Sequence, residues 1–453
     1  MRRVLKWLGV GVAGLFGLAV LGYGVLLVIN WSDEPLSETA QTYLDHLEEL
    51  RDPPLEGNGY FYMLGISAAE DEDPWELARE WRAWWMQGPW YDNSYQDEPR
   101  GPMLDHDSAW LAALSDYFEA CRTPDAECIG LIEAEYDAVQ RGLVDAAPLI
   151  YRYEFMLGLP LWQEQIIDAH IGHQPYLSYL HVFSLSRLYG MYAWALAKSG
   201  ETEAALELMD QEAAFWREVL AEEISDIGKM QVPMALRNNL LWTNQILNLD
   251  WSAVGDAGLS AWQVPGSQAE RDLRVAHAMV LQGFANIENY DYEHGSFVSC
   301  LQEFISKPFF QSGATANRLA EYYEKVNAAM GLPYPEIRQA LDEIVDEQRE
   351  QFSWFQAYNP IGNTLYHIAT YADHNHIWPG FLDLEGARRA LLLAHELRTE
   401  GVAPEDVAAY LEDVSLRDPY SGEAFTWDAE AGAISYQGMG KMAYSFPLTH
   451  PDI

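Results

Sequence analysis

Positively charged residues are scarce in this chain of 453 residues. Lysine and arginine together number 27 against 69 aspartates and glutamates, and the formal net charge is -42. Such a surface repels phosphate backbones and anionic headgroups, which argues against nucleic-acid binding. Only six of the cations are lysines, a balance often met in proteins that work in salty water, so we interpret the acidity as a mark of habitat. The alternative is that the acids serve a cationic ligand.

Common catalytic motifs are also missing. The chain has no Gly-x-Ser-x-Gly, no Walker loop, no His-Glu-x-x-His and no Gly-x-Gly-x-x-Gly that opens a helix after a strand. Carboxylates are so numerous that the sequence singles out no acid-base pair. It therefore leaves open whether the protein is an enzyme, and it assigns no cofactor.

A long apolar run lies near the N-terminus. Residues 7–29 carry no charge, and 23 helical residues at about 1.5 Å each span a hydrocarbon core of about 30 Å. A cleaved signal peptide is the alternative, but cleavage after Gly22–Gly24 would leave the apolar residues Val25–Ile29 at the new terminus. The flanking charges are Arg2, Arg3 and Lys6 before the run, then Asp33 and Glu34 after it. The positive-inside rule therefore predicts a single-pass anchor in a bacterial inner membrane, with residues 1–6 in the cytoplasm and the rest in the periplasm.

Small residues form a ridge on the predicted anchor. Gly9, Ala13 and Gly17 recur every four residues, a spacing that lets two transmembrane helices approach closely. We consider a homodimer through this face, although small residues are common in such helices in any case.

Cysteine usage agrees with export. Cys121 and Cys128 enclose a short loop and are predicted to form a disulfide in an oxidising compartment, which leaves Cys300 over. A redox role is the alternative, but redox chemistry prefers the Cys-x-x-Cys spacing.

The rest of the chain has mainly helical periodicity. Its 17 Trp, 26 Tyr and 16 Phe provide ample apolar area for folding. We expect an all-α class, with helical hairpins over residues 31–414. Asp73, Pro74 and Glu76 predict the start of a helix. Further helices are predicted at 185–198, 202–220, 317–330, 335–355, 384–400 and 404–413.

One helical pair resembles a known repeat. The segment SRLYGMYAWALAKSGETEAALELM, residues 186–209, resembles a tetratricopeptide-type hairpin, with small residues and glycines where such repeats place them. No second copy follows at the period of about 34 residues. The resemblance implies helical-hairpin architecture.

The C-terminal residues 415–453 form a separate loop and β-hairpin module by our prediction, with strands at 424–428 and 433–436. This region is similar to the C-terminal half of type II secretion pseudopilins. The similarity covers the preceding helix, its Glu400-Gly401 end, the Asp-Pro-Tyr-Ser-Gly run at 418–422 and the predicted hairpin. The membrane segment lacks the processed pseudopilin motif and its Glu, so pilin assembly is not implied. The whole chain resembles uncharacterised membrane-anchored helical proteins of bacterial envelopes, which implies architecture and no chemistry.

A histidine-rich segment is the candidate metal site. His367, Asp373, His374 and His376 are suitable ligands for a metal such as zinc. In a helix His374 and His376 would point apart, and His367 with His374 would be the better pair. The alternative is a hydrogen-bonded interior cluster.

An aromatic cluster is the candidate ligand platform. Trp81, Trp84, Trp85, Trp90 and Tyr91 offer rings on which sugars stack. The alternative is a core stripe of the same helix or packing near the membrane.

Our prediction for function is binding or scaffolding in the cell envelope, with an envelope protein as partner. The first alternative is an enzyme that acts on glycan or peptidoglycan in an aromatic-lined cleft with two facing carboxylates. The second is a metal-dependent hydrolase, which requires the histidine-rich residues to converge.

Overall fold

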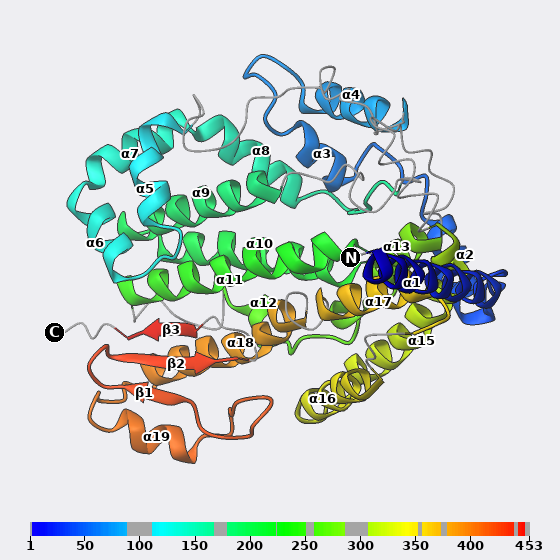
Figure 1. The fold of residues 1–453 in the computed structure, drawn as a ribbon. Helices are drawn as coiled ribbons and strands as arrows, with labels where there is room; N and C mark the ends of the chain where they lie inside the picture. The colour runs from blue at the N-terminus through cyan, green and yellow to red at the C-terminus, as the bar shows by residue number, and fades with distance from the viewer. Residues whose placement is uncertain are drawn as a thin grey trace.

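The computed structural model describes residues 2–87, 111–166, 179–222, 224–250, 258–285, 307–351, 356–372, 378–438 and 443–448. Within these residues the chain is mainly helical, with one small antiparallel sheet near the C-terminus (Figure 1). The predicted all-α class is confirmed.

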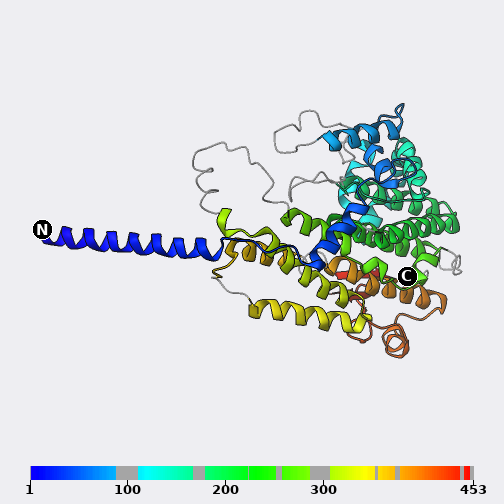
Figure 2. The same ribbon diagram turned by 90° about the vertical axis from the view of Figure 1, so that its right-hand side faces the viewer.

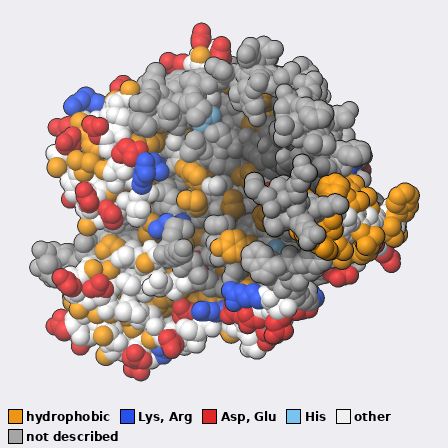
Figure 3. Space-filling model, in the orientation of Figure 1, with side chains coloured by type: hydrophobic (Ala, Val, Ile, Leu, Met, Phe, Trp, Pro, Cys, Tyr) orange, Lys and Arg blue, Asp and Glu red, His pale blue; other side chains and the backbone are white. Residues whose placement is uncertain are grey.

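The first helix, α1 (Arg2–Ile29), projects from the domain as a single rod (Figure 2). Its segment Val10–Ile29 has a mean hydropathy of 2.4, and none of it is buried against the rest of the protein. Apolar side chains cover the rod where it leaves the domain (Figure 3). The helix is therefore long and apolar enough to cross a membrane, as predicted.

Three long helices form the centre of the domain. Gly200 has a φ of 99°, which allows the chain to reverse between the first two. A Cβ added at Gly190 would lie 2.2 Å from the ring of Trp242, so this position needs glycine for the first and third helices to pack. They are α9 (Tyr179–Lys198), α10 (Thr202–Ala221) and α11 (Asp226–Leu249), and the first two confirm the predicted hairpin.

The rest of the N-terminal half consists of shorter helices. Pro74 begins α4, as its Asp-Pro signal predicts, and the Asp73 carboxylate accepts from the Trp75 N–H at 3.0 Å. The elements are α2 (Glu38–Glu49), α3 (Gly59–Gly65), α4 (Pro74–Gln87), η2 (Ala112–Leu114), α5 (Ser115–Ala120), α6 (Ala126–Ala134), α7 (Tyr136–Asp145) and α8 (Ala147–Leu157).

The second half adds further helices, of which α18 packs along α11. The last, α19, begins three residues after the predicted Pro404, because residues 404–406 form a turn closed by Asp406 N–H and Ala403 O at 2.9 Å. The elements are α12 (Ser260–Gln263), η3 (Ala269–Arg271), α13 (Arg274–Ala285), η5 (Lys307–Phe309), α15 (Ser312–Met330), α16 (Tyr334–Gln351), α17 (Pro360–Ala372), α18 (Trp378–Thr399) and α19 (Val407–Asp413).

The sheet contains the two predicted strands and a third strand that was not predicted. Its antiparallel order is β1-β2-β3, with Trp427 opposite Ile434 and Ile434 opposite Phe446. One face packs on α18, and Ile434 and Phe446 are fully buried there. The strands are β1 (Thr426–Asp428), β2 (Ala433–Gln437) and β3 (Ala443–Pro447).

Candidate functional site

A groove on the outside of the domain is formed by α7, α8 and the C-terminal half of α9. Only Ala146 separates α7 from α8, so the two helices meet at a bend beside α9. The groove has a volume of about 880 Å³, within the range of ligand pockets. Its lining combines acids, tyrosines and aliphatic side chains, among them Asp137, Asp145, Glu154, Tyr151, Tyr192 and Leu196.

The groove is electrostatically negative. Three carboxylates line it against a single cation, Arg141. Burial raises the pKa of Glu154. The pKa of Tyr192 is also raised, by burial and then by the negative charges of Glu154 and Glu201. Within the described residues, neither Glu154 nor Asp145 has a hydrogen-bond donor or ion-pair partner for its carboxylate.

Large apolar side chains stand exposed along the groove and beside it. Val144 at the end of α7 is 73% exposed, and Tyr151 in α8 is 69% exposed. Phe155 follows one turn after Tyr151 and is 45% exposed. An exposed apolar stripe of this kind on a folded domain marks an interaction surface.

The helices that form the groove lie in the part of the domain away from the anchor. In Figure 1 helices α5–α7 lie on the left and α1 on the right, and in Figure 2 α1 projects to the left while the cyan helices lie in the right half of the domain. Exposed apolar side chains in the groove are therefore far from the bilayer that α1 suits.

The foot of α1 is held by buried hydrogen bonds. Asn30, which is 4% exposed, donates from Nδ2 to Ala357 O at 2.7 Å and accepts at Oδ1 from the Asn359 N–H at 2.7 Å. The Asn30 carbonyl accepts from Gln311 Nε2 at 3.0 Å. Asn359 has a φ of 50°, which Asn tolerates better than most residues. Three residues more than 280 positions away, Gln311, Ala357 and Asn359, thus surround Asn30 at the end of the anchor.

Asp33 also binds the domain, because it caps α15 although it lies far from that helix in the sequence. We call the hydrogen-bonded contacts of Asn30 and Asp33 the anchor junction. The Asp33 carboxylate accepts from Gly313 N–H at 2.6 Å and Ala314 N–H at 3.0 Å, and also from Ser312 Oγ at 3.2 Å. The residue in the local capping position, Gln311, forms no side-chain cap. The residues that directly follow α1 are thus hydrogen-bonded to the start of α15 and to the segment before α17.

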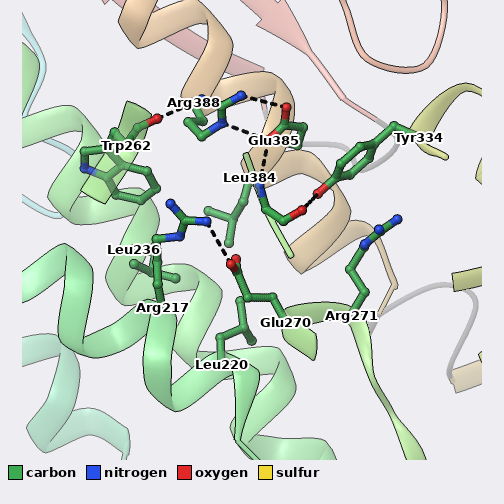
Figure 4. Close-up of a pocket in the computed structure, with 11 residues that line it drawn as sticks. Arg217, Leu220, Leu236, Trp262, Glu270, Arg271, Tyr334, Leu384, Glu385 and Arg388 are labelled. Atoms are coloured by element: carbon green, nitrogen blue, oxygen red, sulfur yellow. Dashed lines mark hydrogen bonds and ion pairs between the residues drawn. The ribbon is translucent and has the colours of Figure 1, made fainter. Parts of the chain in front are cut away.

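A second cavity lies inside the domain and is lined by ion pairs (Figure 4). Glu385 accepts from Arg388 Nε at 2.8 Å and from Arg389 Nε at 2.7 Å, while Arg217 Nη2 and Glu270 Oε1 lie 2.8 Å apart. Burial raises the pKa of Glu385, but the hydrogen bonds and charges of the two arginines outweigh it and hold the pKa below its usual value. The cavity measures about 20 Å³, room for about one water molecule, so these charges join helices and admit no substrate.

A buried acid in the central helices is also satisfied. Glu212 is fully buried and accepts from Tyr153 Oη at 2.7 Å and from Asn239 Nδ2 at 2.9 Å. Burial raises the pKa of Glu212 to about 7, although its hydrogen bonds oppose that shift. This acid belongs to the core of the domain.

The structure joins Cys121 and Cys128 by a disulfide with a Cα–Cα distance of 4.8 Å. Both side chains are buried, and the bond ties the end of α5 to α6. Asp125 starts α6 by accepting from the Glu127 and Cys128 N–H groups. The leftover Cys300 lies outside the described residues.

Of the predicted metal ligands, the structure describes only His367, on α17. Burial and the charge of Arg318 lower its pKa. Asp373, His374 and His376 lie outside the described residues. The described part of the chain contains no group of three or more His, Cys, Asp or Glu placed to hold a metal ion.

The predicted aromatic platform is partly described. Trp81, Trp84 and Trp85 lie on α4, with the Trp81 and Trp84 rings 5.6 Å apart edge to face. Trp85 is 2% exposed and packs 5.9 Å from the Tyr60 ring, while Trp81 and Trp84 are half-buried. Trp90 and Tyr91 lie outside the described residues. Of the three described tryptophans of the predicted platform, Trp81 and Trp84 are therefore the accessible ones.

The predicted dimer ridge lies on the projecting part of α1. Ala13 is exposed, and a Cβ added at Gly17 would meet no atom within 4 Å. Close approach of a second helix at Gly9, Ala13 and Gly17 remains a prediction.

No sequence motif predicted the groove. The signal present was the pair Tyr151 and Phe155, two large side chains four residues apart on a face that Ala147 and Gly158 continue. From the sequence alone, that face would be predicted to be buried in the core, because the sequence does not show which face of α8 is buried.

No protein-family model, no curated protein and no solved structure matches this chain. The resemblances to tetratricopeptide hairpins and pseudopilins remain predictions from the sequence.

Proposed function

We propose that the protein is a membrane-anchored binding or scaffolding protein of the bacterial cell envelope. The observation that carries this proposal is the groove of about 880 Å³ formed by α7, α8 and α9, which is large enough for a ligand, whereas the charged interior cavity measures about 20 Å³. The hydrogen bonds of Asn30 and Asp33 support the scaffolding part, since they join the end of α1 directly to the domain.

The proposed location is the periplasm, with α1 crossing the inner membrane. The basic residues Arg2, Arg3 and Lys6 at the N-terminal end of α1 and the buried Cys121–Cys128 disulfide support this orientation. Alkaline phosphatase fused after Ile453 tests it, because that enzyme is active only where disulfides form. We expect activity from the fusion; an inactive fusion would place the domain in the cytoplasm.

Photocrosslinking in living cells tests the binding role. A photoreactive amino acid replaces Val144 in the groove, and in a matched control it replaces Val264, which is 60% exposed on the α12–η3 loop. We expect one protein adduct of defined mass from position 144 and none from position 264. Equal adducts from both positions, or none from either, would contradict a dedicated binding groove.

A glycan-acting enzyme is the second candidate. The groove places Tyr151 and Tyr192 beside Glu154, whose pKa is raised by burial, and such a carboxyl suits a general acid. Full-length protein in nanodiscs, incubated with purified peptidoglycan, should then release reducing ends, and Glu154→Gln should abolish that release. No release from the unmodified protein would rule this candidate out.

A further inference from the structure

We propose that the groove between α7, α8 and α9 binds a basic, amphipathic segment of a partner protein. This inference rests on the binding role proposed above and names the chemistry of the occupant. Asp137, Asp145 and Glu154 line the groove against Arg141 alone, so a cationic segment complements its charge.

The carboxylates are available to a ligand. Glu154 is half-buried, and neither it nor Asp145 is hydrogen-bonded or ion-paired within the described residues. A carboxylate that loses water without gaining a donor is unfavourable, and a Lys or Arg side chain supplies both the donor and the charge. Elsewhere in the domain, partly or fully buried acids such as Glu270 and Glu385 already have arginine partners.

Tyrosine rings add a second feature suited to cations. Tyr151 and Tyr192 line the same groove as the acids, and the face of a tyrosine ring attracts ammonium and guanidinium groups. The lining therefore favours Lys or Arg over neutral polar side chains.

The occupant also needs apolar side chains. Val144, Tyr151 and Phe155 are exposed, and Phe155 lies outside the groove lining, so the apolar surface extends beyond the groove itself. A metal ion or a small polyamine would leave this stripe uncovered. A peptide segment with alternating basic and apolar residues covers both parts.

A membrane does not fit this surface. The helices that form the groove lie in the part of the domain away from α1 (Figures 1 and 2), and hydrogen bonds at Asn30 and Asp33 join the end of α1 to the domain. The negative charge of the groove also repels anionic lipids.

The test uses full-length protein in nanodiscs and a short fluorescein-labelled peptide that alternates lysine and leucine, with a glutamate-leucine peptide as control. Fluorescence anisotropy should show binding of the lysine peptide alone. Raising NaCl from about 50 to about 300 mM should weaken it at least about tenfold. Binding of both peptides, or of neither, overturns the inference.

Matched variants separate the groove from the overall negative charge. Asp145→Asn with Glu154→Gln should weaken binding about tenfold, and Tyr151→Ala by a similar factor. The control, Glu336→Gln with Asp342→Asn, removes two exposed acids from α16 and should change binding less than about twofold. Thermal unfolding checks that each variant is folded. Equal losses in the groove and control variants overturn the inference.

Two further outcomes separate this inference from the proposed function. If Val144 crosslinks to a partner in cells and the groove variants still bind it, the binding role holds and the basic occupant is wrong. If the lysine peptide binds vesicles of phosphatidylcholine carrying the protein no better than bare vesicles, the groove has no such affinity and the inference fails.

Discussion

Buried acids of the interior and acids of the distal groove differ in their partners. Glu385 has two arginines, and Glu212 has a tyrosine and an asparagine, all within 3 Å. Glu154 and Asp145 have no such partners within the described residues. In a chain with 69 acidic residues, acid content alone identifies no site. Acids that have hydrogen-bond or ion-pair partners stabilise the fold, whereas acids without such partners can bind a ligand.

The largest expected effect on stability comes from the removal of Glu385. Glu385→Ala leaves Arg388 and Arg389 without their buried acceptor, and we expect a loss of about 3–5 kcal/mol in the free energy of unfolding. Urea denaturation of the protein in nanodiscs measures it. A loss below about 1 kcal/mol would mean that the ion pairs contribute no more than surface pairs do.

The pH dependence of stability tests Glu212. Its pKa is raised to about 7 by burial, so its contribution is fully present below the unfolded pKa, near 4.5, and is lost as the pH rises through about 7. The difference corresponds to about 3 kcal/mol. Glu212→Gln should remove this slope between pH 4.5 and 7, as seen by urea denaturation at several pH values. The same slope in both proteins would assign it to other groups.

Removing the disulfide tests the link beside the groove helices. It joins positions seven apart, and a loop this short corresponds to about 2–3 kcal/mol of stabilisation. Cys121→Ala with Cys128→Ala should lower the free energy of unfolding by that amount. Dithiothreitol should lower the stability of the unmodified protein and leave the variant unchanged.

Asp33→Ala tests the anchor junction. The Gly313 and Ala314 N–H groups lose their acceptor, which costs about 1 kcal/mol of local stability at the start of α15. Hydrogen exchange followed by mass spectrometry should show faster exchange in residues 312–318. Asp33→Asn keeps an acceptor oxygen and serves as control, with a smaller effect.

The smallest change in stability should come from replacing Glu154 in the groove. Glu154→Gln removes a partly buried charge that has no described partner, and we expect stability at pH 7 to change by less than about 0.5 kcal/mol, towards a gain. Because the pKa of Glu154 is raised in the folded protein, the gain should vanish at low pH, where the carboxyl is protonated. A loss comparable to that of Glu385→Ala would remove the distinction between the two regions.

The local elements were largely predictable from the sequence. Asp73-Pro74 predicts the start of α4, and the Ser199-Gly200 break predicts the turn between α9 and α10. These signals depend on neighbouring residues, which is why they can be read directly. The strand β3 was missed because only its pairing with β2, at Ser435 and Ser445 for example, makes it a strand.

The candidate sites were less predictable, because they depend on contacts between distant residues. Asp33 caps a helix 280 positions away, and no local sequence motif predicts that role. In the groove, Glu154 differs from the other acids only in what the fold places around it. The tryptophans of α4 were visible in the sequence, but the burial of Trp85 against Tyr60 was not.

The junction at Asn30 and Asp33 also has a consequence for encounter with partners. A domain on a loose tether samples many heights above the bilayer, whereas one fixed to its anchor holds the groove at one height. Partners that carry their segment at that height meet it by diffusion in two dimensions and at a high effective concentration. Partners are thereby selected by how far from the membrane they carry their binding segment. The length of the domain between the anchor and the groove sets that distance.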